Sequence, residues 1–310
     1  MATKEMRTVY AETLVELAAA DPRIVVLEAD LMRATGTGPF KAAYPDRCFN
    51  AGVAEADMVG VAAGLSAEGK VPFAASFGCF ASRRVFDQFF ISCAYARLAV
   101  KLVGTEPGIT AAYNGGTHMP FEDLGLMRMV PGLDIVEPSD PVSLAALVRA
   151  LASRPGCAYL RLHRRAVEPR YREGETFAVG SAKLLREGRH LAIVALGAFM
   201  VGEALKAADL LAAAGIEASV IDALSLKPLD ARLILAEARR TGAVLTAENH
   251  QIAGGLGSAV AELIAENGGA KLARVGVRDE FGEVGTEAYL AERFRLRAED
   301  LAEAARALVA

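Results

Sequence analysis

The sequence has little cysteine, little net charge and no long apolar run. Its four cysteines among 310 residues show no Cys-x-x-Cys spacing and no clustered histidines, so we expect no structural zinc site. The 34 basic and 38 acidic residues leave a formal net charge of -4, which argues against a nucleic acid or an anionic membrane as partner. No segment reaches the ~18 to 20 uninterrupted apolar residues that a membrane-spanning helix requires.

The amino-terminal stretch is too acidic for a secretory signal, because it carries Glu5, Glu12 and Glu16. We therefore expect a cytoplasmic protein whose thiols are reduced. Hydrophobic residues make up 53% of the chain and charged residues 23%, a balance that excludes intrinsic disorder.

Short apolar runs alternate with amphipathic helical patterns along the whole chain. Strands are expected over residues 23–28, 71–75, 99–103, 134–136, 158–162, 190–196, 218–221, 243–247 and 273–277. Helical patterns occupy residues 5–19, 54–65, 141–152, 203–214 and 257–264. This alternation predicts an α/β fold of two doubly wound domains with mostly parallel sheets. The polar stretch 164–176 interrupts both patterns, so we expect domains of residues 1–170 and 171–310.

Ligand sites in open α/β sheets lie where strands run into the following helices. The segment FNAGVAEADMVGVAAGL passes through Gly52 into a helix with Glu55 in its first turn. Glu55 and Asp57 could simply complement the positive end of the helix dipole, which is worth ~0.3 to 1 kcal/mol. The helix is too apolar to be an exposed one, however, and burial favours the protonated form of a carboxyl group. Glu55 is therefore a candidate for sharing a proton with a heterocycle.

The segment SFGCFASRRVFDQ follows an expected strand and combines aromatic and basic residues. Phe77 and Phe80 could offer a ring face to a flat ligand, although an isolated pair of this kind is more simply part of the core. Arg83 and Arg84 beside this apolar run suggest that an anion lies nearby.

Two glycine-containing loops complete the candidates. TEPGITAAYNGGTHMPFED presents His118, one of four histidines, and histidine is the commonest side chain for proton transfer, although a lone loop histidine is usually just solvated. AENHQIAGGLGSAVAE places Gly254–Gly257 before a helix, where backbone N–H groups can cradle an anion. It lacks the full dinucleotide-binding fingerprint, and tight loop packing is the simpler explanation of its glycines.

Taken in order, these segments resemble the C-terminal half of transketolase. GVAEADMVGVAAGL resembles the glutamate helix of the family, with Glu55-Ala56 where Glu-Gln is usual. SFGCFASRRVFDQ resembles its aromatic segment, and GGTHMPFEDLGLMRMVPGLDIVEPSDP its substrate-histidine loop. ENHQIAGGLGSAVAE and GVRDEFGEVG resemble its C-terminal domain. The likeness spans residues 8–309 and is specific because several motifs keep their order and spacing.

The resemblance implies a pyrimidine-binding domain followed by a transketolase C-terminal domain, with thiamine diphosphate as cofactor. The family holds the diphosphate and Mg with a Gly-Asp-Gly and asparagine motif on a separate domain, and no such motif occurs here. The chain thus resembles one subunit of a split transketolase. The implied partner is a diphosphate-binding subunit that carries the Mg ligands, in a heterotetramer with self-association of this chain.

The resemblance also implies roles for individual residues toward the cofactor. Glu55 would be the acid that hydrogen-bonds a pyrimidine nitrogen and favours the imino tautomer. Phe80 would stack on the pyrimidine face, and Phe77 would close the pocket. The other cofactor contacts that it implies are Asp30, Leu31 and Arg83.

On the substrate side, the sequence both matches and departs from the family. His118 matches the histidine near the donor hydroxyls, and Arg164 matches the arginine that holds the acceptor phosphate. Asn114 replaces an acid that reads a sugar hydroxyl. Glu106 stands where many members have a histidine, and Ala34 where some have a phosphate-binding serine. Because Glu106 would oppose a phosphate dianion, we expect an acceptor with less phosphate character than ribose 5-phosphate.

The leading hypothesis is therefore a transketolase subunit that transfers a two-carbon ketol unit from a ketose donor to an aldehyde acceptor. One alternative is the beta chain of a 2-oxo acid dehydrogenase, which shares the fold, the glutamate and the two-chain arrangement. Another is a catalytically silent structural or regulatory partner of the same fold. The GGTHMPFED and RRVFDQ segments favour transketolase.

Overall fold

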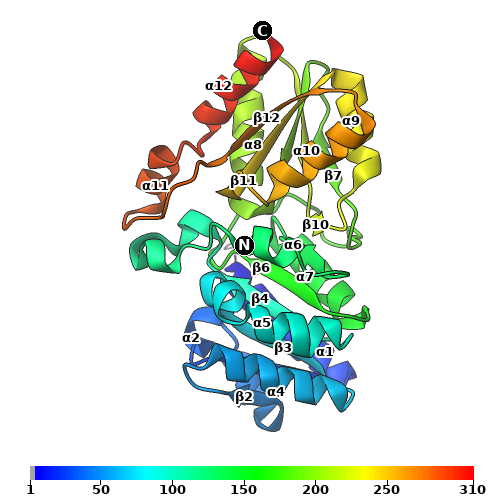
Figure 1. The fold of residues 1–310 in the computed structure, drawn as a ribbon, viewed down its shortest axis with the longest axis vertical. Coiled ribbons are helices and arrows are strands. Elements are labelled where there is room, and N and C mark those ends of the chain that lie inside the picture. The colour runs from blue at the N-terminus through cyan, green and yellow to red at the C-terminus, as the bar shows by residue number, and fades with distance from the viewer. Residues whose placement is uncertain (1–3) are drawn as a thin grey trace. The chain divides into compact units, whose positions relative to one another are not determined.

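The computed structural model describes residues 4–310, which form two compact α/β units (Figure 1). The first unit comprises the chain up to Pro107 together with Leu126–Val179. The second comprises Gly108–Gly125 and Gly180–Ala310. The predicted fold of two mostly parallel, helix-covered sheets is confirmed. Gly108–Gly125 belongs to the second unit by its contacts, although it precedes the last strand of the first.

The first unit contains a parallel sheet in which strands lie in the order β5-β6-β4-β3-β1-β2. These strands are β1 (Ile24–Glu28), β2 (Cys48–Asn50), β3 (Val71–Phe77), β4 (Lys101–Thr105), β5 (Asp134–Val136) and β6 (Ala158–Leu162). All residues of β1, β4, β5 and β6 are buried, as expected of a parallel sheet covered on both faces. Helices up to the end of this unit are α1 (Met6–Ala20), α2 (Met32–Thr35), α3 (Gly38–Ala43), α4 (Glu55–Ala67), α5 (Phe86–Gln88), α6 (Asp123–Arg128) and α7 (Pro141–Ser153).

Several segments between these elements form helical turns of unusual width. Phe80–Arg84 and Phe89–Tyr95 are π-helical, and Pro45–Arg47, Gly108–Asn114 and Gly116–His118 are 3₁₀ turns. Single π-helical turns occur preferentially at functional sites. The aromatic segment that the sequence singles out contains such a π-helical turn, whereas the histidine segment contains 3₁₀ turns.

The second unit has the sheet order β12-β11-β8-β9-β7, in which only the β7 edge strand is antiparallel. The strands of this sheet are β7 (Lys183–Arg186), β8 (Leu191–Ala195), β9 (Ala218–Asp222), β11 (Ala243–Gln251) and β12 (Lys271–Val277). The short strand β10 (Ser225–Lys227) belongs to the same unit but not to this sheet. Its helices are α8 (Gly197–Ala213), α9 (Ala231–Thr241), α10 (Leu256–Asn267), α11 (Glu287–Arg293) and α12 (Ala298–Val309). Figure 1 shows α8 and α12 on one face of this sheet and α9 and α10 on the other.

The core of the second unit includes residues from the inserted Gly108–Gly125 segment. Side chains of β8, β9 and β11 pack with those of α8 and α12. Ile109, Ala111, Met119 and Phe121 belong to the same buried cluster, and Phe121 meets Phe294 edge-on with ring centres 5.3 Å apart. The segment is thus anchored by apolar burial, the dominant favourable term in folding.

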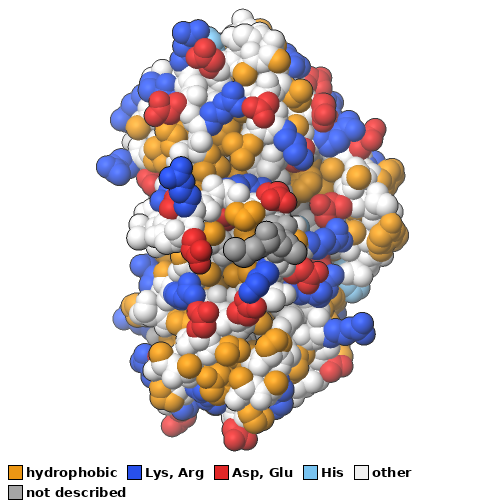
Figure 2. Space-filling view, turned by 180° about the vertical axis from the view of Figure 1, so that it is seen from behind, with side chains coloured by type: hydrophobic (Ala, Val, Ile, Leu, Met, Phe, Trp, Pro, Cys, Tyr) orange, Lys and Arg blue, Asp and Glu red, His pale blue; other side chains and the backbone are white. Residues whose placement is uncertain are grey.

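The surface shown in Figure 2 carries basic and acidic side chains interspersed over the visible face. None of the helices formed by residues 4–310 combines the length and the apolar character needed to cross a membrane. The four cysteines, Cys48, Cys79, Cys93 and Cys157, are buried and form no disulfide.

Candidate active site

Glu55 is the first residue of α4, and its side chain is only 2% exposed. Arg84 donates to its Oε2 at 3.0 Å, and the hydroxyl of Ser76 lies 3.5 Å from its Oε1. The helix packs on β3, whose end carries Ser76. The side chain of Glu55 is therefore buried, as the apolar character of the helix predicts. Its carboxylate has Arg84 as a cationic partner.

The rings of Phe77 and Phe80 form an aromatic pair, with ring centres 6.1 Å apart and planes inclined by 42°. The guanidinium carbon of Arg84 lies 4.0 Å from the centre of the Phe80 ring, within cation–π range. Arg84 therefore joins the carboxylate of Glu55 to the aromatic pair. Arg83, the residue that the resemblance assigns to the cofactor, is exposed on the same π-helical turn. Two adjacent arginines had suggested a nearby anion, and Glu55 is that anion for Arg84.

Asp30 lies at the end of β1 in a left-handed conformation with φ of 60°. Its backbone N–H donates to Oδ1 of Asn50 at 2.9 Å, and the Asn50 amide donates back to its carboxylate at 3.2 Å. Leu31, the next residue, precedes α2 and is half-buried. Non-glycine residues with positive φ concentrate at functional sites because their strain must be compensated by neighbours. Asn50 is a supporting residue that the sequence did not indicate.

Glu28 is fully buried directly before this turn. Its Oε1 accepts hydrogen bonds from Thr35 at 2.7 Å and from Thr37 at 2.6 Å, so it ties the α2 segment to β1. Burial raises the pKa of Glu28 to about 7, although the two hydroxyls oppose the shift. The titratable neighbours on other elements are Tyr10 and Cys48, whose own pKa values are raised mainly by burial and also by the charge of Glu28.

Glu106 and Arg164 form a salt bridge at the ends of the adjacent strands β4 and β6. The Glu106 side chain is 2% exposed and its backbone has φ of 59°, whereas Arg164 is 24% exposed. His163 is also buried, and this burial, with the charges of Arg165, Arg170 and Arg164, lowers its pKa to about 4. The positive charge that Arg164 can offer to an anion is therefore countered by Glu106.

Asn114 and His118 lie in the second unit, on the two 3₁₀ turns of Gly108–Gly125. Asn114 is exposed, and His118 is half-buried with its Nδ1 2.9 Å from the hydroxyl of Thr117. Ala112, inside the first of these turns, has φ of 48°, a further strained position. The structure thus groups Glu55, Phe77 and Phe80 in the first unit and Asn114 and His118 in the second.

The glycine-rich loop before α10 is filled by a side chain of this chain. Glu248 accepts the backbone N–H groups of Leu256 at 2.7 Å and Gly257 at 2.8 Å. A β-carbon at Gly255 would lie 2.0 Å from a carboxylate oxygen of Glu248. Close packing therefore explains these glycines, which agrees with the simpler of the two interpretations of the sequence, tight loop packing.

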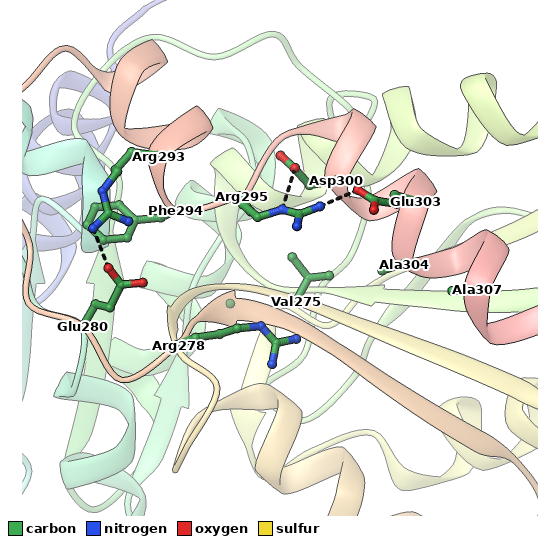
Figure 3. Close-up of a pocket in the computed structure, with 11 residues that line it drawn as sticks. Val275, Arg278, Glu280, Arg293, Phe294, Arg295, Asp300, Glu303, Ala304 and Ala307 are labelled. Atoms are coloured by element: carbon green, nitrogen blue, oxygen red, sulfur yellow. Dashed lines mark hydrogen bonds and ion pairs between the residues drawn. The ribbon is translucent and has the colours of Figure 1, made fainter.

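A pocket of about 440 Å³ lies between β12 and α12 in the second unit (Figure 3). Arg293 pairs with Glu280 at 2.5 Å, and Arg295 pairs with Asp300 at 3.2 Å. Val275 contributes to its apolar floor. The paired charges largely balance, and none of the residues proposed to bind cofactor or substrate lines this pocket.

Comparisons with known proteins show which families this chain is similar to. The family model "Transketolase, pyrimidine binding domain" matches residues 2–169, and "Transketolase, C-terminal domain" matches residues 180–301. The 6-deoxy-6-sulfo-D-fructose transketolase subunit SqwH of Clostridium sp. (strain MSTE9) is 50% identical over 300 residues, which cover 97% of this chain and 93% of the relative.

Solved structures show the same relationship. A chain described as "Split gene transketolase, inactive beta4 tetramer" superposes with a TM-score of 0.91 and 42% identity, covering 99% of both chains. A transketolase mutant from Pichia stipitis shares the fold, with a TM-score of 0.84 and 21% identity. This chain spans only 46% of the length of that chain.

Proposed function

The chain belongs to the transketolase family, and from that premise we propose that it is one subunit of a thiamine diphosphate-dependent transketolase. The reaction moves a two-carbon ketol unit from a ketose donor to an aldehyde acceptor. The observation that carries the proposal is the buried carboxylate of Glu55, which Arg84 links to the Phe77–Phe80 ring pair. Asp30 and Leu31 are proposed to line the same cofactor site, and Arg83 to contact the cofactor from the π-helical turn.

The residues present fit an aminopyrimidine ring. A carboxyl group at 2% exposure can exchange a proton with a ring nitrogen, and a flat aromatic face suits stacking. When bound, thiamine diphosphate supplies a carbon nucleophile that stabilises the transferred unit. Glu55 would hold the proton that sets the tautomer of the ring, Phe80 would orient it, and Phe77 would exclude water. His118 would donate a hydrogen bond to a substrate oxygen while that oxygen bears negative charge.

The diphosphate and Mg are proposed to be held by a partner chain. The sequence lacks the Gly-Asp-Gly and asparagine motif of the family. Across residues 4–310, the structure contains no group of three or more His, Cys, Asp and Glu side chains placed to hold a metal ion. A diphosphate-binding transketolase subunit would supply both functions, and the relative described as a split-gene transketolase supports such a division between chains.

Self-association is proposed to use the exposed stripe of α4. Gly60 and Gly64 lie one turn apart on this helix, and a β-carbon at either position would meet nothing within 4 Å. Val61 beside them is 41% exposed. Small residues let two backbones approach closely, and a split-gene relative is described as a beta4 tetramer. A heterotetramer with the diphosphate-binding subunit would follow if two copies of this chain pair through α4.

The substrate is proposed to carry a group with less negative charge than a phosphate dianion. Arg164 would bind that group, but its salt bridge with Glu106 leaves little net positive charge there. A sulfonate has one negative charge, whereas a phosphate monoester carries about -1.5 to -2 at pH 7. The relative SqwH is named for 6-deoxy-6-sulfo-D-fructose, a ketose with such a group. We therefore propose a sulfonated or unphosphorylated sugar as substrate, with Asn114 selecting among its hydroxyl configurations.

The test is reconstitution of this chain with a co-expressed diphosphate-binding subunit, thiamine diphosphate and Mg. Mass spectrometry would follow 6-deoxy-6-sulfo-D-fructose and fructose 6-phosphate as donors with a panel of aldehydes. Ketol transfer that depends on both chains supports the proposal. Decarboxylation of a 2-oxo acid with acyl transfer to lipoamide would instead identify a dehydrogenase beta chain. No turnover with any pair would favour a silent structural partner.

A further inference from the structure

Three consecutive polar residues end β11: Asn249, His250 and Gln251. Asn249 is 2% exposed, His250 is fully buried and Gln251 is half-buried. They contact two segments of the second unit, Gly108–Gly125 and 279–285, which we call the substrate segment and the distal segment. The substrate segment carries Asn114 and His118.

Asn249 holds the start of the substrate segment. Its Oδ1 accepts the backbone N–H of Ile109 at 3.0 Å, across a sequence separation of 140 residues. Gly108 has φ of 51°, and a β-carbon there would lie 2.1 Å from this same oxygen. The approach is close enough that only glycine fits opposite Asn249.

His250 and the backbone of Gln251 hold the end of the same segment. The N–H of Gly125 donates to Nε2 of His250 at 3.3 Å, and the N–H of Gln251 donates to the carbonyl of Phe121 at 2.9 Å. Nδ1 of His250 lies 2.7 Å from the carbonyl of Gln251, which is consistent with a neutral imidazole protonated at Nδ1. Both ends of the substrate segment are thus bound to one stretch of β11.

The side chain of Gln251 fixes the distal segment. Its Oε1 accepts the N–H of Asp279 at 2.8 Å, and its Nε2 donates to the carbonyl of Glu280 at 2.9 Å. Glu280 is held from its other side by Arg293, as Figure 3 shows. The restraint therefore extends from β11 through the distal segment to α11.

The distal segment in turn packs on the turn that carries His118. A β-carbon at Gly116 would lie 2.0 Å from the carbonyl oxygen of Gly282, so the two backbones touch. A β-carbon at Gly282 would lie 2.5 Å from the sulfur of Met119. His118 is therefore flanked in sequence by two residues that contact the distal segment.

We propose that Asn249 and Gln251 are positioning residues that set the geometry of Asn114 and His118, so that the second unit contributes to substrate selectivity. The inference rests on the proposed function for the roles of Asn114 and His118. The restraint itself rests on hydrogen bonds and backbone approaches within one unit. A strained turn, with Ala112 at φ of 48°, persists only where its surroundings over-determine it.

The first experiment is hydrogen exchange with mass spectrometry on the isolated full chain, comparing Asn249→Ala with wild type. Amides of residues 109–119 should exchange at least ~10-fold faster, while those of β8 and β9 keep their protection. Asn249→Asp retains the acceptor oxygen and should restore slow exchange. Asn267→Ala, at the end of α10, is the matched control and should change nothing in this segment. Unchanged exchange over 109–119, or a rise spread over the whole unit, would overturn the proposal that Asn249 restrains the substrate segment.

The second experiment measures selectivity in the reconstituted complex. Asn249→Ala and Gln251→Ala should change the ratio of kcat/KM between two ketose donors by ~10-fold or more, with rescue by Asn249→Asp. Faster amide exchange with an unchanged kcat/KM ratio would mean that the restraint is merely structural. That result would overturn its role in selectivity. If the wild-type complex lacks ketol transfer, the proposed function fails. The hydrogen-exchange result still decides whether Asn249 restrains the substrate segment.

Discussion

The guanidinium of Arg84 lies 3.0 Å from Oε2 of Glu55 and 4.0 Å from the centre of the Phe80 ring. Arg84 is half exposed, whereas the Glu55 side chain is buried. An arginine in this position neutralises a carboxylate that would otherwise be costly to bury. Because the proposed pyrimidine site uses the same carboxylate and the same ring, cofactor binding should require Arg84 to yield part of this contact.

Replacing Glu55 with Gln should reduce turnover of the reconstituted complex by at least ~100-fold, because the variant keeps the shape but cannot exchange a proton. Cofactor affinity should fall far less. Steady-state kinetics and titration of thiamine diphosphate measure both quantities. Asp57→Gln, in the same helical turn, is the control that changes a charge outside the pair. Near-normal turnover of Glu55→Gln would reduce Glu55 to a residue that complements the helix dipole.

The Arg84–Glu55 pair should show energetic coupling in the isolated chain. Arg84→Met leaves a buried carboxylate without its counter-charge, so the free energy of unfolding should fall by about 1 to 3 kcal/mol. In the Glu55→Gln background the same substitution should cost clearly less. Urea unfolding of the four proteins gives the coupling energy. The exposed pair Lys4–Glu12 is the matched control and should show almost none. Equal costs in both backgrounds would mean that the contact contributes nothing.

Glu106→Gln should shift preference toward phosphorylated substrates. The substitution removes the negative charge beside Arg164, and a charge-assisted hydrogen bond of ~1.5 to 3 kcal/mol corresponds to roughly one to two decades in affinity. We expect the kcat/KM ratio of fructose 6-phosphate to 6-deoxy-6-sulfo-D-fructose to rise by that factor. Glu137→Gln, which disrupts the buried Glu137–Arg161 pair, should destabilise the chain without changing the ratio. A hundredfold preference of wild type for phosphorylated substrates would contradict the assigned role of Glu106.

Glu28 should make the chain less stable as pH rises from about 5 to 7. Its folded pKa of about 7 exceeds the ordinary value of 4.5, so the folded state binds more protons in this window. Its contribution is therefore fully present below pH 4.5 and is lost as pH passes through 7, by up to about 3 kcal/mol. Glu28→Gln can still accept the hydrogen bonds of Thr35 and Thr37 but does not titrate, so its stability should change less over this window.

Urea unfolding of the isolated chain between pH 5 and 8 measures this difference. The exposed Glu68→Gln serves as the control, because its stability should follow the wild-type curve. Parallel curves for wild type and Glu28→Gln would show that Glu28 titrates at its ordinary pKa.

Val61→Glu should dissociate the self-associated chain, because it places a charge on the exposed glycine stripe of α4. Sedimentation velocity at micromolar concentration should show a shift toward monomer, with the fold retained by circular dichroism. Leu210→Glu changes a residue of similar exposure on α8, 39% against 41%, and should leave the assembly intact. A wild-type chain that is already monomeric, alone and with its partner subunit, would refute self-association.

Local patterns were sufficient for the architecture and for part of the candidate site. The strands of the first sheet are buried on both faces, so they must read as continuous apolar runs, and β1, β3, β4 and β6 were predicted from these runs. Glu55 was found because a carboxylate inside an apolar helix conflicts with its surroundings. The prediction lacks β2, β7 and β10, because these strands have three or four residues and little periodicity.

What the sequence by itself determined is therefore the α/β order of elements, the family resemblance and the residue types available for chemistry. Only the tertiary structure decided which of them meet. Arg84 contacts Glu55 because the direction of its side chain follows from a π-helical turn that propensities do not predict. Glu106 meets Arg164 because β4 and β6 are adjacent in the sheet, and Asn249 meets Ile109 across 140 residues. Pairings of this kind depend on strand order and register, which arise from the packing of the whole unit and leave no signal at either position alone.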